Sequence, residues 1–282
     1  MAKPVMNLLG VDVGFAAKAK TTGLAWRING EVGYVRTGTA WMARKRSLPH
    51  DVVFSLAALD APILPAQEGQ PHRSCESVFY GGAFWNRCRP GLSHYGRSSL
   101  LREAGADAAS QFANVISGLK LKPDIAVRRE CAIVEAFPNA FLGVLLPAGV
   151  YQHKVGDRRE AKSDWLYRAV AEEDLLLKLL LELDWADGKT ADLFVKQAGK
   201  DGHHDVRAAL VCLLTAGFAA SNKATVVGDK ACGWFWLPPL GFWNEWAREA
   251  LESQIRKLRA GKFPTITQWT TSVLLQAPVT RN

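Results

Sequence analysis

Four acidic residues stand at the ends of, or inside, segments that the sequence predicts to be buried. Asp12 ends one apolar run, Asp60 ends another, Glu135 lies within a third, and Asp205 opens an apolar helix. Acidic side chains are almost never fully buried unless they are paired or bind a metal ion. Each residue alone could be an ordinary turn or helix-start acid. The recurrence of the pattern therefore indicates a shared site.

Carboxylates that meet at one edge of a sheet repel one another unless a cation neutralises them. Hard oxygen ligands favour Mg²⁺ or Mn²⁺. Two such ions about 4 Å apart support in-line attack of water on a phosphodiester. We therefore expect Asp12, Asp60, Glu135 and Asp205 to be catalytic residues of a cation-dependent nuclease.

The elements that must position these acids begin with three strands, at residues 5–13, 22–28 and 31–38. Asn29-Gly30 is a strong hairpin signal, so the three strands are expected to be antiparallel. The apolar segments 51–60 and 132–138 are typical of buried central strands. Helices are predicted over 98–119 and 160–185, the second ending at Asp187-Gly188, and after Asp205. This order predicts an α/β fold with a mixed sheet and helices on its faces.

Asp205 is expected on the inward face of its helix. Residues 205, 209, 212 and 213 share one side, and three of them are Ala209, Cys212 and Leu213. Adjacent His203 and His204 are more typical of exposed polar residues, although one could ligate a metal ion or orient water.

The length of 282 residues suits one large domain. We expect a single domain over 1–282, with an irregular insertion at about 64–123 and a Trp-rich C-terminal extension at about 230–282. The extension holds Trp234, Trp236, Trp243 and Trp246. Packing on the core is the favoured interpretation of these rings, and a platform for nucleobases is the alternative.

The chain is basic, with 35 Lys and Arg against 27 Asp and Glu, which gives a net charge of +8. This permits nucleic acid as a partner. Among the cations near the predicted site and within the insertion, five are predicted to bind the substrate: Lys18, Lys20, Arg73, Arg87 and Arg97. Interleaved aromatics such as Phe79, Phe84 and Trp85 suit contact with bases. An irregular segment packed by its own aromatics explains the same pattern, and a solvated face explains the basic run at 41–49.

The five cysteines are odd in number and form no C-x-x-C pair, which suits a reducing compartment. The N-terminus shows no long apolar segment typical of a signal peptide. No stretch of 18 or more apolar residues predicts a membrane span. A cytoplasmic location is the resulting expectation.

The motifs GVDVG, LDAPI, VEAFP, HHDVRAAL and GWFWLPP, in this order, resemble the predicted ribonuclease-H-like nucleases grouped as domain of unknown function 429. The segment from Arg73 to Glu76 is similar to that family's R-x-C-[DE] region. The resemblance covers roughly residues 6–240. The chain departs from the family at 16–20, which lacks a glycine pair, and at His203 and His204, where an acid is more usual.

The resemblance implies a ribonuclease-H-like fold, with three antiparallel strands followed by parallel ones. By likeness to Holliday-junction resolvases of that fold, Asp12, Asp60 and Asp205 would be metal ligands, with Glu135 a fourth ligand or a neighbour.

Two other functions stay open. One is a non-catalytic nucleic-acid-binding module of the same fold. The other is a nucleotide-dependent phosphotransferase of the actin-like or sugar-kinase type, with Thr21, Thr22 and Gly81-Gly82 as its phosphate-loop candidates.

Overall fold

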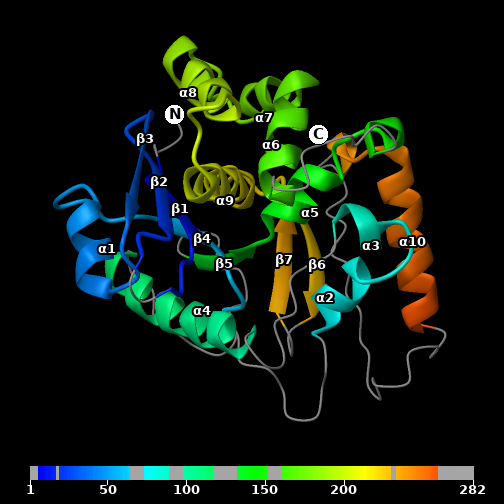
Figure 1. The fold of residues 1–282 in the computed structure, drawn as a ribbon, viewed down its shortest axis with the longest axis horizontal. Helices are drawn as coiled ribbons and strands as arrows, with labels where there is room; N and C mark the ends of the chain where they lie inside the picture. The colour runs from blue at the N-terminus through cyan, green and yellow to red at the C-terminus, as the bar shows by residue number, and fades with distance from the viewer. Residues whose placement is uncertain are drawn as a thin grey trace, which may run out of the picture.

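A seven-stranded mixed sheet organises the chain (Figure 1). The computed structural model describes residues 6–16, 19–63, 73–88, 98–116, 132–151, 161–229 and 233–259. The strand order is β3-β2-β1-β4-β5-β7-β6. The strands are β1 (Leu8–Asp12), β2 (Thr22–Ile28), β3 (Glu31–Thr37), β4 (Leu56–Asp60), β5 (Ala132–Ala136), β6 (Thr225–Asp229) and β7 (Gly233–Leu237).

The first three strands form the predicted antiparallel meander. β2 and β3 are joined by Asn29 and Gly30, whose φ angles of 51° and 92° are those of a tight hairpin turn. Ile28 therefore pairs with Glu31, and the register continues to Thr22 opposite Thr37. The hairpin sequence thus fixes which side chains of β2 and β3 share a face.

The remaining strands complete a mixed sheet, as the sequence predicts. β4 runs parallel to β1, β5 parallel to β4, and β7 parallel to β5, while β6 is an antiparallel edge strand. β5 falls within a segment that the sequence predicts to be a strand. β7 is a strand where the sequence predicted only a packed C-terminal element.

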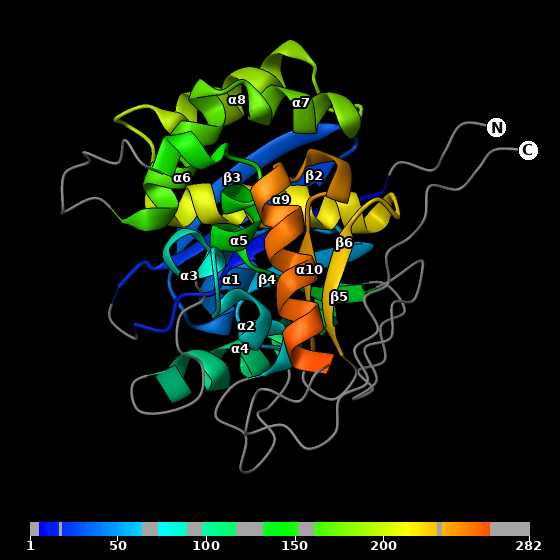
Figure 2. The same ribbon diagram turned by 90° about the vertical axis from the view of Figure 1, so that its right-hand side faces the viewer.

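Helices cover both faces of the sheet (Figures 1 and 2). One face carries α9 (His204–Ala220), with α6 (Lys162–Glu172), α7 (Leu175–Glu182) and α8 (Gly188–Ala198) beyond it. The opposite face carries α1 (Trp41–Ser47) and α4 (Ser98–Phe112). Four further helices lie nearer β6 and β7: α2 (Ser74–Phe79), α3 (Phe84–Arg87), α5 (Pro138–Gly143) and α10 (Glu245–Arg259). Short 3-10 turns occupy Ala113–Val115, Ala148–Tyr151 and Leu240–Phe242.

Helix α9 is the central helix of the fold. Fourteen of its 17 residues are buried, so it is apolar nearly all round. A Cβ on Gly10 of β1 would overlap the backbone of Ala209 and Leu213. The absence of a side chain at Gly10 therefore lets α9 lie directly on the sheet.

Three helix predictions differ from the structure. The helix predicted over 98–119 ends at Phe112 and is followed by a 3-10 turn at Ala113–Val115. The expected single helix over 160–185 is two helices, because Asp174 adopts a left-handed φ of 53° between them. Asp187 does not end a helix but begins α8, since its carboxylate accepts a hydrogen bond from the Thr190 N–H at 3.0 Å.

Parts of the predicted insertion belong to the core. Cys75, Val78, Phe79 and Phe84 are almost wholly buried within the larger apolar cluster. The interpretation of this segment as packed by its own aromatics therefore fits Phe79 and Phe84 better than base contact does. Of the helices in the described part of the chain, none has the length and apolar character needed to cross a bilayer.

Candidate functional site

A row of residues crosses four neighbouring strands where β1 and β4 end. Arg36 of β3 pairs with Gly23 of β2, Gly23 pairs with Asp12 of β1, and Asp12 pairs with Asp60 of β4. Residues paired directly across a sheet point to the same face. That face is the one under α9, because Gly10, two residues before Asp12, touches Ala209. Two acids and one cation therefore meet beneath α9.

The start of α9 brings Asp205 to this row. A Cβ on Gly23 would overlap the Asp205 carbonyl, so the glycine leaves the space in which the helix begins. Arg36 Nε donates to Asp205 Oδ2 at 2.9 Å. His203 caps the helix, its Nδ1 accepting from the Asp205 N–H at 3.3 Å. Asp205 is 8% exposed, which confirms the predicted inward orientation.

Burial and neighbouring negative charges raise the affinity of Asp12 and Asp60 for protons. Burial, followed by the negative charges of Asp60 and Asp205, raises the pKa of Asp12 well above its usual range, while Arg44 opposes the shift. Burial and the charge of Glu135 raise the pKa of Asp60 to about 7, with His204 opposing. Excess negative charge is therefore concentrated where β1 and β4 end.

Arg44 of α1 supports the turn that follows Asp12. Its side chain is 2% exposed and donates to the Gly14 carbonyl at 2.9 Å and to Thr22 Oγ1 at 3.3 Å. The basic run at 41–49, read from the sequence as a solvated face, therefore contributes one buried cation, while Lys45 and Arg46 are exposed. The positive charge of Arg44 offsets part of the negative charge of Asp12.

Glu135 does not join the other three acids. It pairs with Leu59 rather than with Asp60, so its side chain leaves the sheet on the opposite face. Both of its oxygens accept from Arg73, at 2.6 and 2.7 Å. Arg73 also bonds Glu76 through Nε and Nη2, at 3.0 and 2.8 Å. Glu135 is therefore part of a buried ion cluster, and this geometry argues against its predicted catalytic role.

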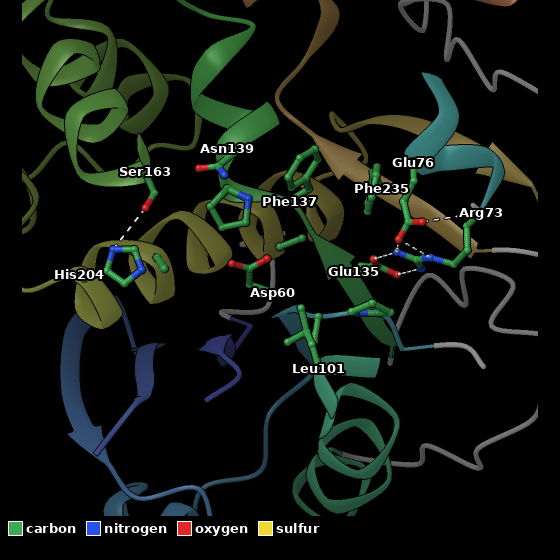
Figure 3. Close-up of a pocket in the computed structure, with 15 residues that line it drawn as sticks. Asp60, Arg73, Glu76, Leu101, Glu135, Phe137, Asn139, Ser163, His204 and Phe235 are labelled. Atoms are coloured by element: carbon green, nitrogen blue, oxygen red, sulfur yellow. Dashed lines mark hydrogen bonds and ion pairs between the residues drawn. The ribbon is translucent and has the colours of Figure 1, made fainter. Parts of the chain in front are cut away.

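A cavity of about 300 Å³ lies between Asp60 and this ion cluster (Figure 3). On its other side stands His204, whose Nδ1 lies 3.2 Å from both Asp164 Oδ1 and Ser163 Oγ. Asp164 also pairs with Arg207 at 2.9 Å. The hydrogen bond with Asp164 raises the pKa of His204 although burial opposes the shift. The His204 ring is thus held in place through its Nδ1 atom.

The acids of the described residues do not form a complete protein cage for a metal ion. Among the described residues, no group of three or more His, Cys, Asp or Glu side chains is arranged to hold a metal ion. Asp205 Oδ2 is already bonded to Arg36. Asp12 and Asp60 remain side by side on paired strands. Mg²⁺ is commonly held by one or two carboxylates together with water and substrate phosphates.

The predicted substrate-binding cations have different environments. Lys20 is exposed, and its carbonyl accepts from Arg36 Nη2 at 2.8 Å. Arg73 is 3% exposed and bonded to two carboxylates, which argues against its predicted contact with phosphates. Arg87 lies over the rings of Trp246 and Tyr151, at 4.2 and 5.1 Å from their centroids. Lys18 and Arg97 lie outside the described residues.

The candidate phosphate loops of a phosphotransferase are also occupied by protein contacts. Thr22 is fully buried and bonded to Arg44. A Cβ on Gly81 or Gly82 would meet the side chain of Gln254 in α10. These contacts weaken the case for a phosphate-binding role of Thr22 and Gly81-Gly82.

Several residues of the site were not predicted from the sequence: Arg36, Arg44, Asn139, Ser163 and Asp164. For Arg36 a signal exists. The Asn29-Gly30 turn sets the register that places Arg36 opposite Gly23. Gly23 in turn pairs with Asp12 on the neighbouring strand. The other residues come from separate helices, and no short-range pattern connects them to the acids.

Comparison with known proteins found no matching family model, no matching curated protein and no matching solved structure. The resemblance to the ribonuclease-H-like family therefore stays an expectation.

Proposed function

We propose that this protein is a ribonuclease-H-like hydrolase that cleaves phosphodiester bonds of nucleic acid with the help of a divalent cation. The observation that carries the proposal is the direct pairing of Asp12 with Asp60 beneath Asp205. The strand order β3-β2-β1-β4-β5, with an antiparallel start and parallel continuation, supports the fold assignment.

The cation would be held by Asp12 and Asp60, with Asp205 beside them. The raised pKa values of Asp12 and Asp60 reflect a site in which their full ionisation is unfavourable, and a divalent cation would relieve that charge. When bound, Mg²⁺ or Mn²⁺ would supply Lewis-acid activation of water and stabilisation of the leaving oxygen.

The other residues organise the site. Arg36 holds Asp205 by one oxygen and so fixes the start of α9 over the sheet. Arg44 holds the Asp12 turn through the Gly14 carbonyl. Lys20, whose carbonyl is bonded to Arg36, and His204, which lines the cavity with Asp60, would contact the phosphates that flank a scissile bond.

The test is a cleavage assay with labelled single-stranded, duplex and branched DNA and RNA, in Mg²⁺ or Mn²⁺. We expect Asp12→Asn and Asp60→Asn each to reduce cleavage by on the order of a hundredfold or more. Asp192→Asn, an exposed acid on α8, is the matched control and should retain activity. Calorimetry with the cation alone should show binding to the wild type that is lost in Asp12→Asn.

Cleavage that persists unchanged in both site variants would contradict the proposal. Salt-sensitive binding of nucleic acid without cleavage, equal in wild type and Asp12→Asn, would instead identify a non-catalytic binding module.

A further inference from the structure

The cavity beside Asp60 has walls suited to a flat ring. Its lining includes Phe137 and Pro138 at the start of α5, Leu101 of α4 and Phe235 of β7. Figure 3 shows the two phenylalanines and the leucine around it. Its volume of about 300 Å³ is at the small end of ligand pockets, which span about 300–1,000 Å³. The Phe137 and Phe235 ring centroids are 4.8 Å apart at an interplanar angle of 35°. Both rings are well buried, and their positions are therefore fixed by packing.

Asn139 lines the cavity and carries a polar atom for which the described residues provide no partner. Asn139 Oδ1 is buried and has no hydrogen-bond partner among the described residues. A buried polar group without a partner is unfavourable for the folded protein. A ligand that donates a hydrogen bond inside the cavity would satisfy Asn139.

The charge of the cavity excludes phosphate from its interior. Arg73 uses four of its five N–H groups on Glu76 and Glu135, so the cluster combines two carboxylates with one guanidinium. Asp60 adds a further acid at the other side. Carboxylate oxygens accept more than one hydrogen bond each, and the cavity is therefore rich in acceptors. It favours a neutral ligand that carries N–H donors.

We propose that this cavity binds one nucleobase of the substrate, and that it prefers bases with an exocyclic amino group over uracil and thymine. The inference rests on the proposed function, since it assigns the base to the nucleotide whose phosphate lies at Asp12 and Asp60. The ring stacks on Phe137 or Phe235, and its amino group donates to Asn139 and the acidic cluster. A base enters such a cavity only when it is unstacked, so the substrate is single-stranded or locally opened.

Free nucleosides test the cavity without any cleavage. The thermal unfolding midpoint of the full-length protein is measured with adenosine, cytidine or uridine, and affinities are obtained by calorimetry. We expect adenosine and cytidine to stabilise the protein and uridine to have several-fold weaker affinity. Asn139→Leu should weaken adenosine binding by roughly tenfold without lowering the unfolding midpoint of the free protein, because it removes an unsatisfied buried atom.

Asn114→Leu is the matched control, since Asn114 is exposed beyond the end of α4 and its side chain donates to the neighbouring carbonyls of Ser110 and Gln111. It should leave adenosine binding unchanged. Equal affinity for all three nucleosides, or undiminished binding in Asn139→Leu, would overturn the proposal. Stronger stabilisation by spermidine than by adenosine would also overturn it, because the acidic cavity would then be a site for organic cations.

The two proposals fail in different ways. Cleavage that depends on Asp12 but shows no base preference, with no nucleoside binding, would refute the base pocket and leave the hydrolase standing. Nucleoside binding that requires Asn139, in a protein without cleavage activity, would support the pocket and refute the hydrolase.

Discussion

Arg73 is a single buried cation that joins two elements far apart in sequence. Its guanidinium connects Glu76 of α2 to Glu135 of β5 and lies 5.5 Å from the centre of the Phe235 ring. The segment around α2 is thereby tied to the central strands. Removing one partner of a buried ion pair is strongly destabilising, because the remaining charge loses its compensation.

We therefore expect Arg73→Met to lower the free energy of unfolding by about 3–5 kcal/mol near neutral pH. Burial already raises the pKa of Glu135 above its usual value although Arg73 opposes the shift, and loss of the cation raises it further. A carboxyl group whose pKa is higher in the folded than in the unfolded protein makes the protein less stable as the pH rises above the unfolded-state pKa, which is about 4.3. The loss of unfolding free energy in Arg73→Met should therefore increase from pH 4 to pH 7, as measured by urea unfolding.

Arg168→Met is the matched control for this experiment. Arg168 pairs with Glu172 at 3.6 Å on an exposed face of α6, where such pairs contribute little. A deficit in Arg73→Met that is as small as that of the control, or that does not change with pH, would show that the ion cluster does not hold α2 to the sheet.

The positions of the acids at strand ends were largely predictable, but the face of the sheet to which each side chain points was not. Asp12 and Asp60 follow apolar runs whose ends are marked by Gly14 and Pro62. Glu135 follows a similar run, yet a shift of one residue in register decides its face. Sequence patterns do not fix strand register to one residue, and so the bonding of Glu135 to Arg73 on the opposite face was not predicted, although Glu135 still lines the same cavity as Asp60.

At the scale of elements, the contact between α9 and β1 determines where the site lies. Gly10 and Gly23 leave no side chains between the helix and the sheet, so the helix backbone rests on the strands. Asp205 is carried to Asp12 by this contact. The same closeness makes the site sensitive to a single methyl group.

Gly10→Ala is expected to destabilise the protein by about 3 kcal/mol, because its Cβ overlaps backbone that can move only if α9 shifts. Calorimetric affinity for Mg²⁺ or Mn²⁺ should fall together with the unfolding midpoint. Gly241→Ala is the control, since a Cβ there meets nothing within 4 Å. Unchanged stability in Gly10→Ala would show that α9 is not seated on β1 as described.

Elements with strong local signals were predicted well, and those defined by tertiary contacts were not. The hairpin at Asn29-Gly30 gave β2 and β3 correctly. The break between α6 and α7 depends on Asp174 adopting a positive φ, which the leucine-rich pattern around it conceals. Asp187-Gly188 resembles a helix end in sequence, but the Asp187 carboxylate caps the helix that follows.

At the scale of the whole molecule, one sheet separates two apolar cores. The larger core lies under α9 and around α5, α6 and α10, and the smaller one lies under α1 and α4. The mixed sheet was predictable from the order of the strands. The addition of β7 and β6 beyond β5 was not, because tryptophan-rich β7 has no alternation of polar and apolar residues.

Three thiols report on the integrity of the larger core. Cys75, Cys88 and Cys212 are fully buried within it. Burial raises the pKa of Cys88 to about 12, although Lys162 and Arg87 oppose the shift, and the reactive thiolate is correspondingly scarce.

We expect iodoacetamide to label these three cysteines only as the protein unfolds globally, with one shared midpoint in urea. Peptide-resolved mass spectrometry gives each midpoint, and tryptophan fluorescence gives the global transition for comparison. Labelling of Cys75 or Cys88 at lower urea than Cys212 would show that α2 and α3 open independently of the sheet.

The late position of α9 in the chain has a consequence for biosynthesis. β1, β2, β4 and β5 leave the ribosome before residue 204, while the helix that covers their shared face is still being translated. Until then, Leu8, Ala25, Leu56 and Ala58 have no partner from α9. A nascent chain of about 200 residues would thus expose an apolar sheet face, which is the kind of surface that promotes aggregation and chaperone binding. Folding of the sheet is therefore expected to be completed only after α9 has been translated.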